Sequence, residues 1–341
     1  MKVMMITDAW LPQVNGVVTT LGKIKSGLEQ RGHDVDFLTP AEFASIPCPT
    51  YPEIRLSLMP YAHVRRRIEQ ARPDALHIAT EGPLGIAARK HCLRSGLSFT
   101  TAYHTRFPEY VHARTRLPVA LTYAWLRRFH APSQAVMVPT PAIRDDLTLR
   151  GFANTVLWTR GVDTKTFAPG ERSRLATERP VFLYVGRVAV EKNIEAFLKL
   201  DLPGSKWVVG EGPQREKLEK AYPDVHFAGI KTPGELARYY SAADVFVFPS
   251  LTDTFGLVIL EALACGTPVA AYPVAGPIDV IGTAKVGVLD PDLRQACLRA
   301  LHISRRDARA YAETFSWDKS VAQFESYLAC AQGGAPREAK L

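Results

Sequence analysis

The stretch at residues 250–268, SLTDTFGLVILEALACGTP, decides the fold of this chain. It follows the apolar run Val245–Phe248, and from Phe255 onward it has a helical periodicity that Gly266 and Pro268 would end. The pattern predicts a strand, a polar loop and the start of a helix. Such a junction points unpaired backbone N–H groups and the positive end of the helix dipole at the loop, where a phosphate group binds well.

Two carboxylates stand eight residues apart in this stretch. Asp253 precedes the predicted helix, and Glu261 lies about two turns along it. At a rise of about 1.5 Å per residue, the spacing is roughly 10 Å, which suits groups that hold hydroxyls on opposite sides of a diphosphate. Gly256 would let that diphosphate approach the backbone closely. A nucleotide sugar has this shape, with ribose at one end and hexose at the other.

The stretch resembles the E-x7-E signature of retaining glycosyltransferases of family 4, which adopt the α/β GT-B fold of two facing Rossmann-like domains. In that family the second glutamate holds the ribose and the first holds the sugar. The resemblance therefore gives Glu261 the ribose contact, and it gives the sugar contact to Asp253, which is one methylene shorter than the family's glutamate. It also places the intervening residues Thr254, Phe255, Gly256, Leu257 and Val258 against the donor.

Composition and length favour a protein of two globular domains. The chain has 341 residues, of which 47% are hydrophobic. We expect neither a signal peptide nor a membrane span, since its apolar runs are short and interrupted. Its five cysteines are scattered, odd in number and without CxxC spacing, so we expect no disulfide framework and no zinc site. A reducing cytoplasm fits these features.

The formal net charge of +8 is unevenly distributed. Between Arg89 and Arg128, eight lysines and arginines face one acid, Glu109. Such a basic segment could contact nucleic acid, an anionic membrane or only solvent.

The chain begins with a strand, a loop and a helix, the first unit of a doubly wound domain. The strand is predicted at Val3–Thr7, and the helix ends near Gly32. The loop contains the single Gly16 instead of the GxGxxG of dinucleotide-binding proteins, which disfavours nicotinamide chemistry. In the resembling family this loop abuts the donor sugar and phosphates. Without the resemblance, Gly16 is equally well explained by a tight turn.

His104 follows a predicted strand at Phe99–Tyr103. The carboxyl ends of parallel strands are where open α/β sheets bind ligands, so His104 is a candidate active-site residue, and a structural loop histidine is the alternative. The segment from His104 to Tyr110 reads H-T-x-F-x-x-Y and resembles the lipid-glycosylating branch of family 4, which includes diacylglycerol and sulfolipid synthases. In that family a histidine at this place lies near the transferred sugar.

Two predicted helices, at Tyr61–Gln70 and Leu117–His130, combine aromatic residues with arginines. This composition suits the headgroup region of an anionic bilayer, and the alternative is a pair of buried helices with basic ends. The candidate membrane and acceptor residues are Arg65, Arg66, Arg67, Tyr110, Arg114, Arg116, Trp125, Arg127 and Arg128.

The second half opens with the apolar strand Val181–Val185, followed by the loop GRVAVEKN. Arg187 and Lys192 in this loop offer two fixed positive charges to a diphosphate, and a surface ion pair is the alternative. The loop resembles the family's G-R-x-x-x-E-K-N motif, in which these side chains neutralise the departing phosphate without a metal. The resemblance also places Gly212, Ile230 and Lys231 in the donor site.

Residues 160–169, RGVDTKTFAP, resemble the family's interdomain segment. We therefore expect an N-terminal acceptor-side domain at residues 1–162, completed by a crossover helix at 317–331, and a donor-binding domain at 163–316. Residues 332–341 are expected to form a tail.

The resemblance implies retaining transfer of a hexose or hexuronic acid from a nucleoside diphosphate sugar, with UDP favoured, to a membrane lipid such as diacylglycerol. No metal or other cofactor is expected, and the enzyme would lie on the inner face of the membrane without spanning it. Closure of the domains would bring His104 and Gly16 over the sugar.

Three alternatives stay open. The first is a GDP-mannose-dependent mannosyltransferase acting on a soluble or polymer-linked acceptor, and the second is an inactive sensor of nucleotide sugars. The third is a nucleic-acid-binding protein, which is not expected.

Overall fold

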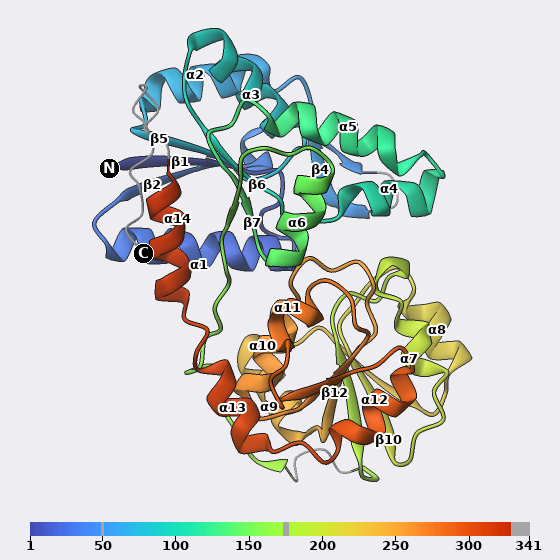
Figure 1. Ribbon diagram of the computed structural model, residues 1–341. Helices are drawn as coiled ribbons and strands as arrows, with labels where there is room; N and C mark the ends of the chain where they lie inside the picture. The colour runs from blue at the N-terminus through green and yellow to red at the C-terminus, as the bar shows by residue number, and fades with distance from the viewer. Residues whose placement is uncertain (49–50, 173–176, 329–341) are drawn as a thin grey trace. The chain divides into compact units, whose positions relative to one another are not determined.

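The computed structural model describes residues 1–48, 51–172 and 177–328, except the side chains of residues 51–53 and 113–114. The chain divides into two units. Unit 1 is Met1–Arg160 with the segment from Trp317, and unit 2 is Gly161–Ser316. Both are three-layer α/β structures built on a parallel sheet (Figure 1), so the prediction of two Rossmann-like domains is confirmed.

The sheet of unit 1 has the strand order β2-β1-β5-β6-β7-β8. Its strands are β1 (Lys2–Ile6), β2 (Asp34–Leu38), β5 (Ala75–Ile78), β6 (Thr100–Ala102), β7 (Val136–Val138) and β8 (Thr155–Leu157). The helices are α1 (Gly16–Gln30), η1 (Pro40–Glu42), α2 (Tyr61–Ala71), α3 (Pro83–Ser95), α4 (Phe107–Thr115), α5 (Val119–His130), α6 (Pro141–Leu149) and α14 (Trp317–Tyr327). Between η1 and α2, the chain forms an antiparallel pair, β3 (Ser45–Cys48) and β4 (Tyr51–Ser57).

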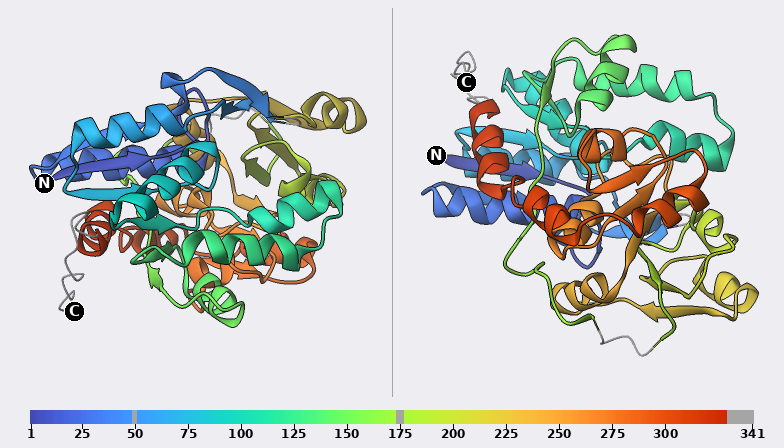
Figure 2. Two further views of the ribbon diagram at one scale, coloured as in Figure 1. Left: turned by 90° about the horizontal axis from the view of Figure 1, so that it is seen from above. Right: turned by 60° about the horizontal axis from the view of Figure 1, so that its bottom comes forward.

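Helices cover both faces of this sheet, which is why its strands are almost continuously apolar. Side chains of α2, α3 and α5 form one core layer, with Ile68, Leu84 and Phe129 among them. Helices α1 and α14 form the other layer and lie side by side (Figures 1 and 2). The second layer therefore combines α1, the first helix of the chain, with α14, the last helix of the described residues.

Trp158 is the largest fully buried side chain, and it fixes α14 to unit 1. Its Nε1 donates to the carbonyl oxygen of Ser320 at 3.2 Å and lies 3.1 Å from the Ser320 hydroxyl. The ring of Phe324 packs 5.0 Å from the indole, between centroids. A helix from the end of the described chain thus completes the core of unit 1.

The sheet of unit 2 has the order β11-β10-β9-β12-β13-β14. Its strands are β9 (Val181–Val185), β10 (Ser205–Val209), β11 (Val225–Gly229), β12 (Val245–Phe248), β13 (Val269–Ala271) and β14 (Gly287–Leu289). The helices are η3 (Val190–Lys192), α7 (Ile194–Leu198), α8 (Arg215–Ala221), α9 (Pro233–Ala242), α10 (Leu257–Ala264), α11 (Pro277–Ile281), α12 (Leu293–Ala300) and α13 (Arg305–Ala312). The strand order reverses between β9 and β12, and such a switch point is where open α/β sheets bind ligands.

Two arginines of α13 hold the carboxyl ends of neighbouring helices. Arg305 donates to the carbonyl oxygens of Ser241 and Ala243 at the end of α9, at 2.8 and 2.6 Å. Arg309 donates to the carbonyl oxygen of Ala264, the last residue of α10, at 2.8 Å. Cations at these ends satisfy orphan carbonyls and oppose the negative end of each dipole. They fix α10, which begins at the switch point.

Candidate functional site

The two predicted phosphate-site loops meet at the switch point of unit 2. Lys192, at the end of η3 after β9, forms an ion pair with Asp253, in the loop after β12, and Nζ lies 2.5 Å from Oδ1. Oδ2 of Asp253 is buried and accepts no hydrogen bond from the described residues. The pair therefore leaves one carboxylate oxygen for a ligand hydroxyl or a water molecule.

Two further hydrogen bonds join the same loops. Nδ2 of Asn193 donates to the carbonyl oxygen of Pro249 at 3.1 Å, and Oγ1 of Thr252 donates to that of Glu191 at 3.2 Å. Asn193 has a left-handed backbone with φ of 51°, a conformation that asparagine tolerates better than most residues. The residues on either side of Lys192 in the sequence are thus hydrogen-bonded to the loop that contains Asp253.

The start of α10 follows a glycine. Gly256 precedes the helix in a left-handed conformation with φ of 86°, which favours glycine, and has no side chain with which to cap the helix. The first turn contains no acid. Thr254 and Phe255 are buried, whereas Leu257 and Val258 are half-buried. The first N–H groups of α10 and the Lys192 ammonium therefore offer positive charge from two directions.

Glu261 lies about one helix turn after Leu257, the first residue of α10. Its Oε2 accepts a hydrogen bond from the Tyr240 hydroxyl at 3.1 Å. Burial raises the pKa of this carboxyl to about 7, although the Tyr240 hydrogen bond opposes the shift. Glu261 consequently titrates near neutral pH. Tyr240 comes from α9, and only the fold reveals the pairing.

The loop that contains Arg187 packs tightly on its neighbours. The Tyr184 hydroxyl donates to the carbonyl oxygen of Arg187 at 2.7 Å, and the Val188 N–H donates to that of Glu211 at 2.8 Å. A Cβ atom on Gly212 would lie 2.3 Å from the Val188 carbonyl oxygen, so a side chain there would displace the loop. The tight packing fixes the backbone from which the half-buried Arg187 side chain extends.

Ile230 and Lys231 follow β11, two strands from β9. Ile230 is 59% exposed, and Nζ of Lys231 lies 5.9 Å from the centroid of the Tyr239 ring. The loop after β11 therefore exposes an apolar side chain.

His104 and Gly16 belong to unit 1. His104 lies in the loop after β6, and its ring meets the Trp158 indole edge-on at 5.7 Å between centroids. Burial, together with the charge of Arg160 and the neighbouring His77, holds its pKa well below the usual value. His104 is therefore neutral at physiological pH. Gly16 is the first residue of α1, which Asn15 caps.

Asp8 was not among the predicted site residues. It follows β1, and its Oδ1 accepts from the Leu84 N–H at the start of α3 at 2.9 Å. The Thr80 hydroxyl donates to Oδ2, also at 2.9 Å. Burial raises the pKa of Asp8 to about 6. The chain thus supplies its own anion to the start of α3. The partners lie more than 70 residues apart in sequence, so no local pattern reveals the contact.

The basic residues singled out from the sequence differ in their surroundings. Arg67 pairs with Asp36 and Glu42, at 3.2 and 2.8 Å, and these hydrogen bonds raise its pKa. Arg65 lies 3.8 Å from Glu69. Arg66, Arg116, Arg127 and Arg128 are exposed, Tyr110 is half-buried, and the side chain of Arg114 lies outside the described residues.

Helices α4 and α5 and the connection between them expose four large apolar side chains, Phe107, Leu117, Leu121 and Trp125, which we call the apolar stripe of α4 and α5. Leu121 is 60% exposed and Trp125 is 41% exposed. Trp125 also lies 6.4 Å from Phe107, between ring centroids. In sequence, the exposed Arg116 directly precedes Leu117, and the exposed Arg128 follows Trp125 by three residues. Helix α5 buries its other face through Tyr123, Leu126 and Phe129, so it is amphipathic and not wholly buried.

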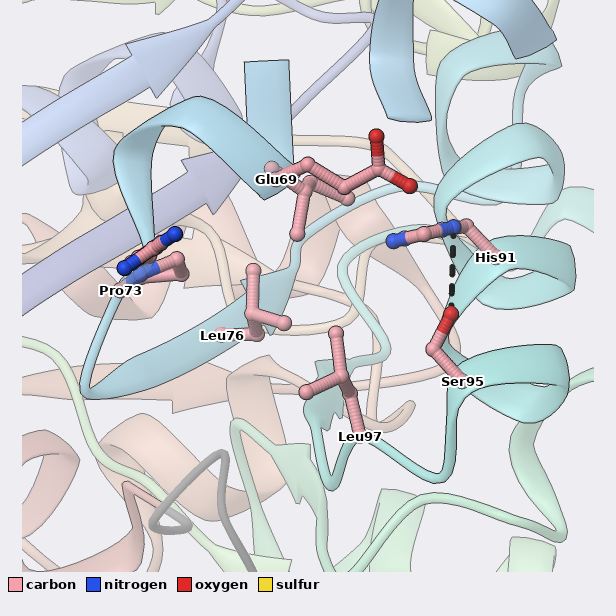
Figure 3. Close-up of a pocket in the computed structure, with 8 residues that line it drawn as sticks. Glu69, Pro73, Leu76, His91, Ser95 and Leu97 are labelled. Carbon is pink, nitrogen blue, oxygen red and sulfur yellow. Dashed lines mark hydrogen bonds between the residues drawn. The ribbon is translucent and has the colours of Figure 1, made fainter. Parts of the chain in front are cut away.

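A pocket of about 220 Å³ lies elsewhere in unit 1 (Figure 3), between the ends of α2 and α3. Leu76, His91 and Leu97 are among its lining residues, and Ser95 hydrogen-bonds to His91 at 3.4 Å. Pro73, which also lines it, precedes β5. The pocket therefore lies toward the amino end of β5, opposite the edge that contains His104 and Asp8.

Within the described ranges, no three His, Cys, Asp or Glu side chains are grouped as metal ligands. None of the described helices is long and apolar enough to cross a membrane.

Two family models match the chain. The model described as "Glycosyltransferase Family 4" matches residues 14–166, and "Glycosyl transferases group 1" matches residues 179–303. Together they span both units.

Similar proteins include a GDP-mannose-dependent alpha-mannosyltransferase of Mycobacterium tuberculosis, 29% identical over 85% of this chain and 84% of that protein. The sulfoquinovosyl transferase SQD2 of Arabidopsis thaliana is 31% identical over 80% of this chain and 60% of that protein. The alpha-monoglucosyldiacylglycerol synthase of Streptococcus pneumoniae is 28% identical over 88% and 78%.

Among solved structures, a sucrose-phosphate synthase from Thermosynechococcus elongatus superposes with a TM-score of 0.78. It is 23% identical and covers 95% of this chain and 97% of that one. At this identity the likeness shows a shared fold.

Proposed function

The chain belongs to glycosyltransferase family 4, and from this membership we propose that it transfers a hexose or hexuronic acid from a nucleoside diphosphate sugar to a membrane lipid. A UDP-linked donor and a diacylglycerol-like acceptor are the first candidates. The bond formed would be alpha, with retention of configuration at the anomeric carbon.

The meeting of Lys192, Asp253 and the α10 N-terminus at the switch point of unit 2 is the observation that supports this proposal most strongly. In the proposed reaction, the bond between the anomeric carbon and the diphosphate oxygen breaks. Lys192, Arg187 and the α10 N–H groups stabilise the charge that develops on the leaving group. The acceptor hydroxyl attacks from the same face of the sugar.

The two carboxylates would orient the donor on either side of the diphosphate. Glu261, when ionised, accepts hydrogen bonds from the ribose hydroxyls, while the free Oδ2 of Asp253 accepts one from a sugar hydroxyl. Gly212, Ile230 and Lys231 would form the part of the site nearest the base. In unit 1, His104 and Gly16 would lie near the transferred sugar.

We propose that catalysis needs no metal ion or other cofactor. Arg187 and Lys192 can supply two positive charges to the diphosphate, which is the task a divalent cation performs in other sugar-nucleotide enzymes. Full activity in excess EDTA would support this proposal, and restoration of a lost activity by Mg²⁺ or Mn²⁺ would refute it.

The lipid acceptor is supported by two observations. One is the apolar stripe of α4 and α5 with its neighbouring arginines, which suits peripheral contact with the anionic inner face of a membrane. The other is the similarity to SQD2 and to alpha-monoglucosyldiacylglycerol synthase. No nucleic-acid partner is proposed.

The similarity to GDP-mannose-dependent alpha-mannosyltransferases favours a second candidate. In it, the donor is GDP-mannose and the acceptor is a soluble or polymer-linked sugar.

A donor panel separates the two candidates. Purified protein is incubated with radiolabelled UDP and GDP sugars and a total lipid extract, and the label in the organic phase is counted. Label from a UDP sugar in the organic phase is expected. Label that comes only from GDP-mannose and stays in the aqueous phase would favour the second candidate. Release of no sugar from any donor would contradict both.

A further inference from the structure

Unit 1 contains a buried positive charge that no acid among the described residues neutralises. Arg160 is only 4% exposed, and no carboxylate among the described residues forms an ion pair with it. Burial alone lowers the pKa of its guanidinium to about 9. Buried charges in proteins are ordinarily paired, because removal from water is costly. The missing counter-charge therefore needs an explanation.

Contacts within the chain occupy only part of the guanidinium. Nη1 donates to the carbonyl oxygens of Trp158 and Thr159, at 2.6 and 3.2 Å, and the guanidinium lies over the Trp158 ring at 3.8 Å. Nε and Nη2 donate no hydrogen bond within the described chain. These contacts fix the orientation of the side chain and leave two N–H-bearing nitrogens for a ligand.

The same indole connects Arg160 with His104. The His104 ring meets Trp158 edge-on, and the charge of Arg160 helps to lower the pKa of His104. His77, whose ring centroid is 6.3 Å from that of Trp158, also has a lowered pKa. Since both histidines are neutral, the cluster has a net charge of about +1 at physiological pH.

We propose that Arg160, with His104 beside it, binds an oxyanion of the substrate: a carboxylate, a sulfonate or a phosphate. A guanidinium offers such a group paired hydrogen bonds, because Nε and Nη2 can donate to two oxygens of the same oxyanion. The inference deepens the proposed function and rests on it, because it places an acidic group on the molecule next to the transferred sugar. That group belongs either to the donor sugar or to the headgroup of the acceptor.

The test compares matched neutral and anionic substrates. Initial rates of the full chain are measured with UDP-glucose, UDP-glucuronate and a UDP-linked sulfo-sugar on diacylglycerol, and with UDP-glucose on phosphatidylinositol. At least one anionic substrate is expected to exceed its neutral counterpart tenfold in kcat/KM. A gain on the donor side assigns the oxyanion to the sugar, and a gain on the acceptor side assigns it to the headgroup.

The variant Arg160→Met should abolish this preference. Arg160→Lys retains the positive charge but lacks the paired N–H donors of a guanidinium. It should therefore retain a smaller preference for the anionic substrate. The control is Arg305→Met in unit 2, because the half-buried Arg305 also donates to main-chain carbonyls. It should leave the preference intact. An Arg160→Met enzyme with unchanged preference, or a wild type without any, would overturn the inference.

A second readout does not depend on glycosyl transfer. The ¹⁵N signals of the His104 imidazole are followed while inorganic phosphate or methanesulfonate is added to the wild type and to Arg160→Met. A saturable shift is expected in the wild type alone. If the shift is seen but no sugar is transferred, the proposed function fails and the oxyanion site stands. If sugar is transferred between neutral substrates and no shift is seen, only the oxyanion site fails.

Discussion

Lys192 and Asp253 lie 61 residues apart in the sequence, yet their side chains form an ion pair between the loops that follow β9 and β12. The pair joins a cation proposed to contact the diphosphate with a carboxylate proposed to contact the sugar. Each side chain therefore holds the other in position. The diphosphate and the sugar of a donor would then be bound by two side chains that contact each other.

Replacement of Lys192 by alanine should lower kcat by about 100-fold or more, because it removes a charge that stabilises the leaving diphosphate. Lys192→Arg should retain more activity than alanine. Initial rates at saturating donor provide the measurement. Lys199→Ala is the control, since Lys199 is exposed and pairs with Glu195 on the surface. Full kcat in Lys192→Ala would contradict the proposed mechanism.

Asp253→Asn should separate recognition of the sugar from recognition of the nucleotide. It removes the negative charge opposite Lys192 and one acceptor for a sugar hydroxyl, so kcat/KM for the nucleotide sugar should fall by roughly 10- to 100-fold. The affinity for UDP alone should change less than threefold, which calorimetry can measure. An equal loss for UDP and UDP-sugar would place Asp253 against the nucleotide.

The affinity for UDP should rise with pH through about 7 because of Glu261. The carboxyl has a raised pKa of about 7, so it becomes ionised, and a better acceptor for the ribose hydroxyls, only above that pH. Titrations between pH 6 and 8.5 test this. Glu261→Gln should bind more weakly above pH 7, and its pH profile should lack this component. The phosphate groups of UDP titrate equally in both proteins, so identical profiles would exclude the ribose role of Glu261.

The same carboxyl should affect the stability of the ligand-free protein. Its folded pKa lies above the ordinary value of 4.5, so folding favours the protonated form. The contribution of the protonated carboxyl to folding stability is fully present below pH 4.5, and it is lost as pH rises to about 7. At pH 8, Glu261→Gln should therefore raise the free energy of unfolding of unit 2 by about 1–3 kcal/mol. Thermal melts at pH 5 and pH 8 measure the difference, which should shrink at the lower pH.

His77 should make unit 1 sensitive to acid. Burial lowers its pKa from 6.5 to about 3, so the unfolded chain binds a proton that the folded chain excludes. Above pH 6.5, His77 does not lower the free energy of unfolding. Between pH 6.5 and 5, this residue alone should lower that free energy by about 2 kcal/mol. Denaturant titrations should show a shallower pH slope in His77→Gln, and an unchanged slope would assign the effect elsewhere.

Charge on the apolar stripe of α4 and α5 should weaken membrane binding. The double variant Leu121→Glu, Trp125→Glu should sediment with anionic vesicles several-fold less than the wild type, because both side chains lose apolar contact with the bilayer. Leu149→Glu is the matched control, since Leu149 is 89% exposed on α6. Binding of the wild type should also decrease at high salt. Equal sedimentation of all three proteins would remove the stripe from the membrane surface.

Local sequence patterns were sufficient to predict the strands and helices. They also singled out the two loops, after β9 and β12, that meet in unit 2. Short apolar runs followed by glycine-containing loops predicted the parallel strands, because both faces of each sheet are covered. They could not predict Tyr240 beside Glu261, Asp8 at the start of α3 or Arg160 over Trp158 and beside His104. The first two contacts join residues far apart in sequence. Arg160 and Trp158 are neighbours in sequence, but the burial of Arg160 and its lack of an acid depend on packing that only the fold supplies.

The dependence of unit 1 on α14 has a consequence for the order of folding during synthesis. Trp158 leaves the ribosome long before Ser320 and Phe324, with all of unit 2 emerging between them. Until α14 emerges, one hydrophobic layer of unit 1 is therefore incomplete. Nascent chains arrested just before residue 317 should therefore expose the indole to solvent and engage chaperones more than chains arrested after α14 has emerged.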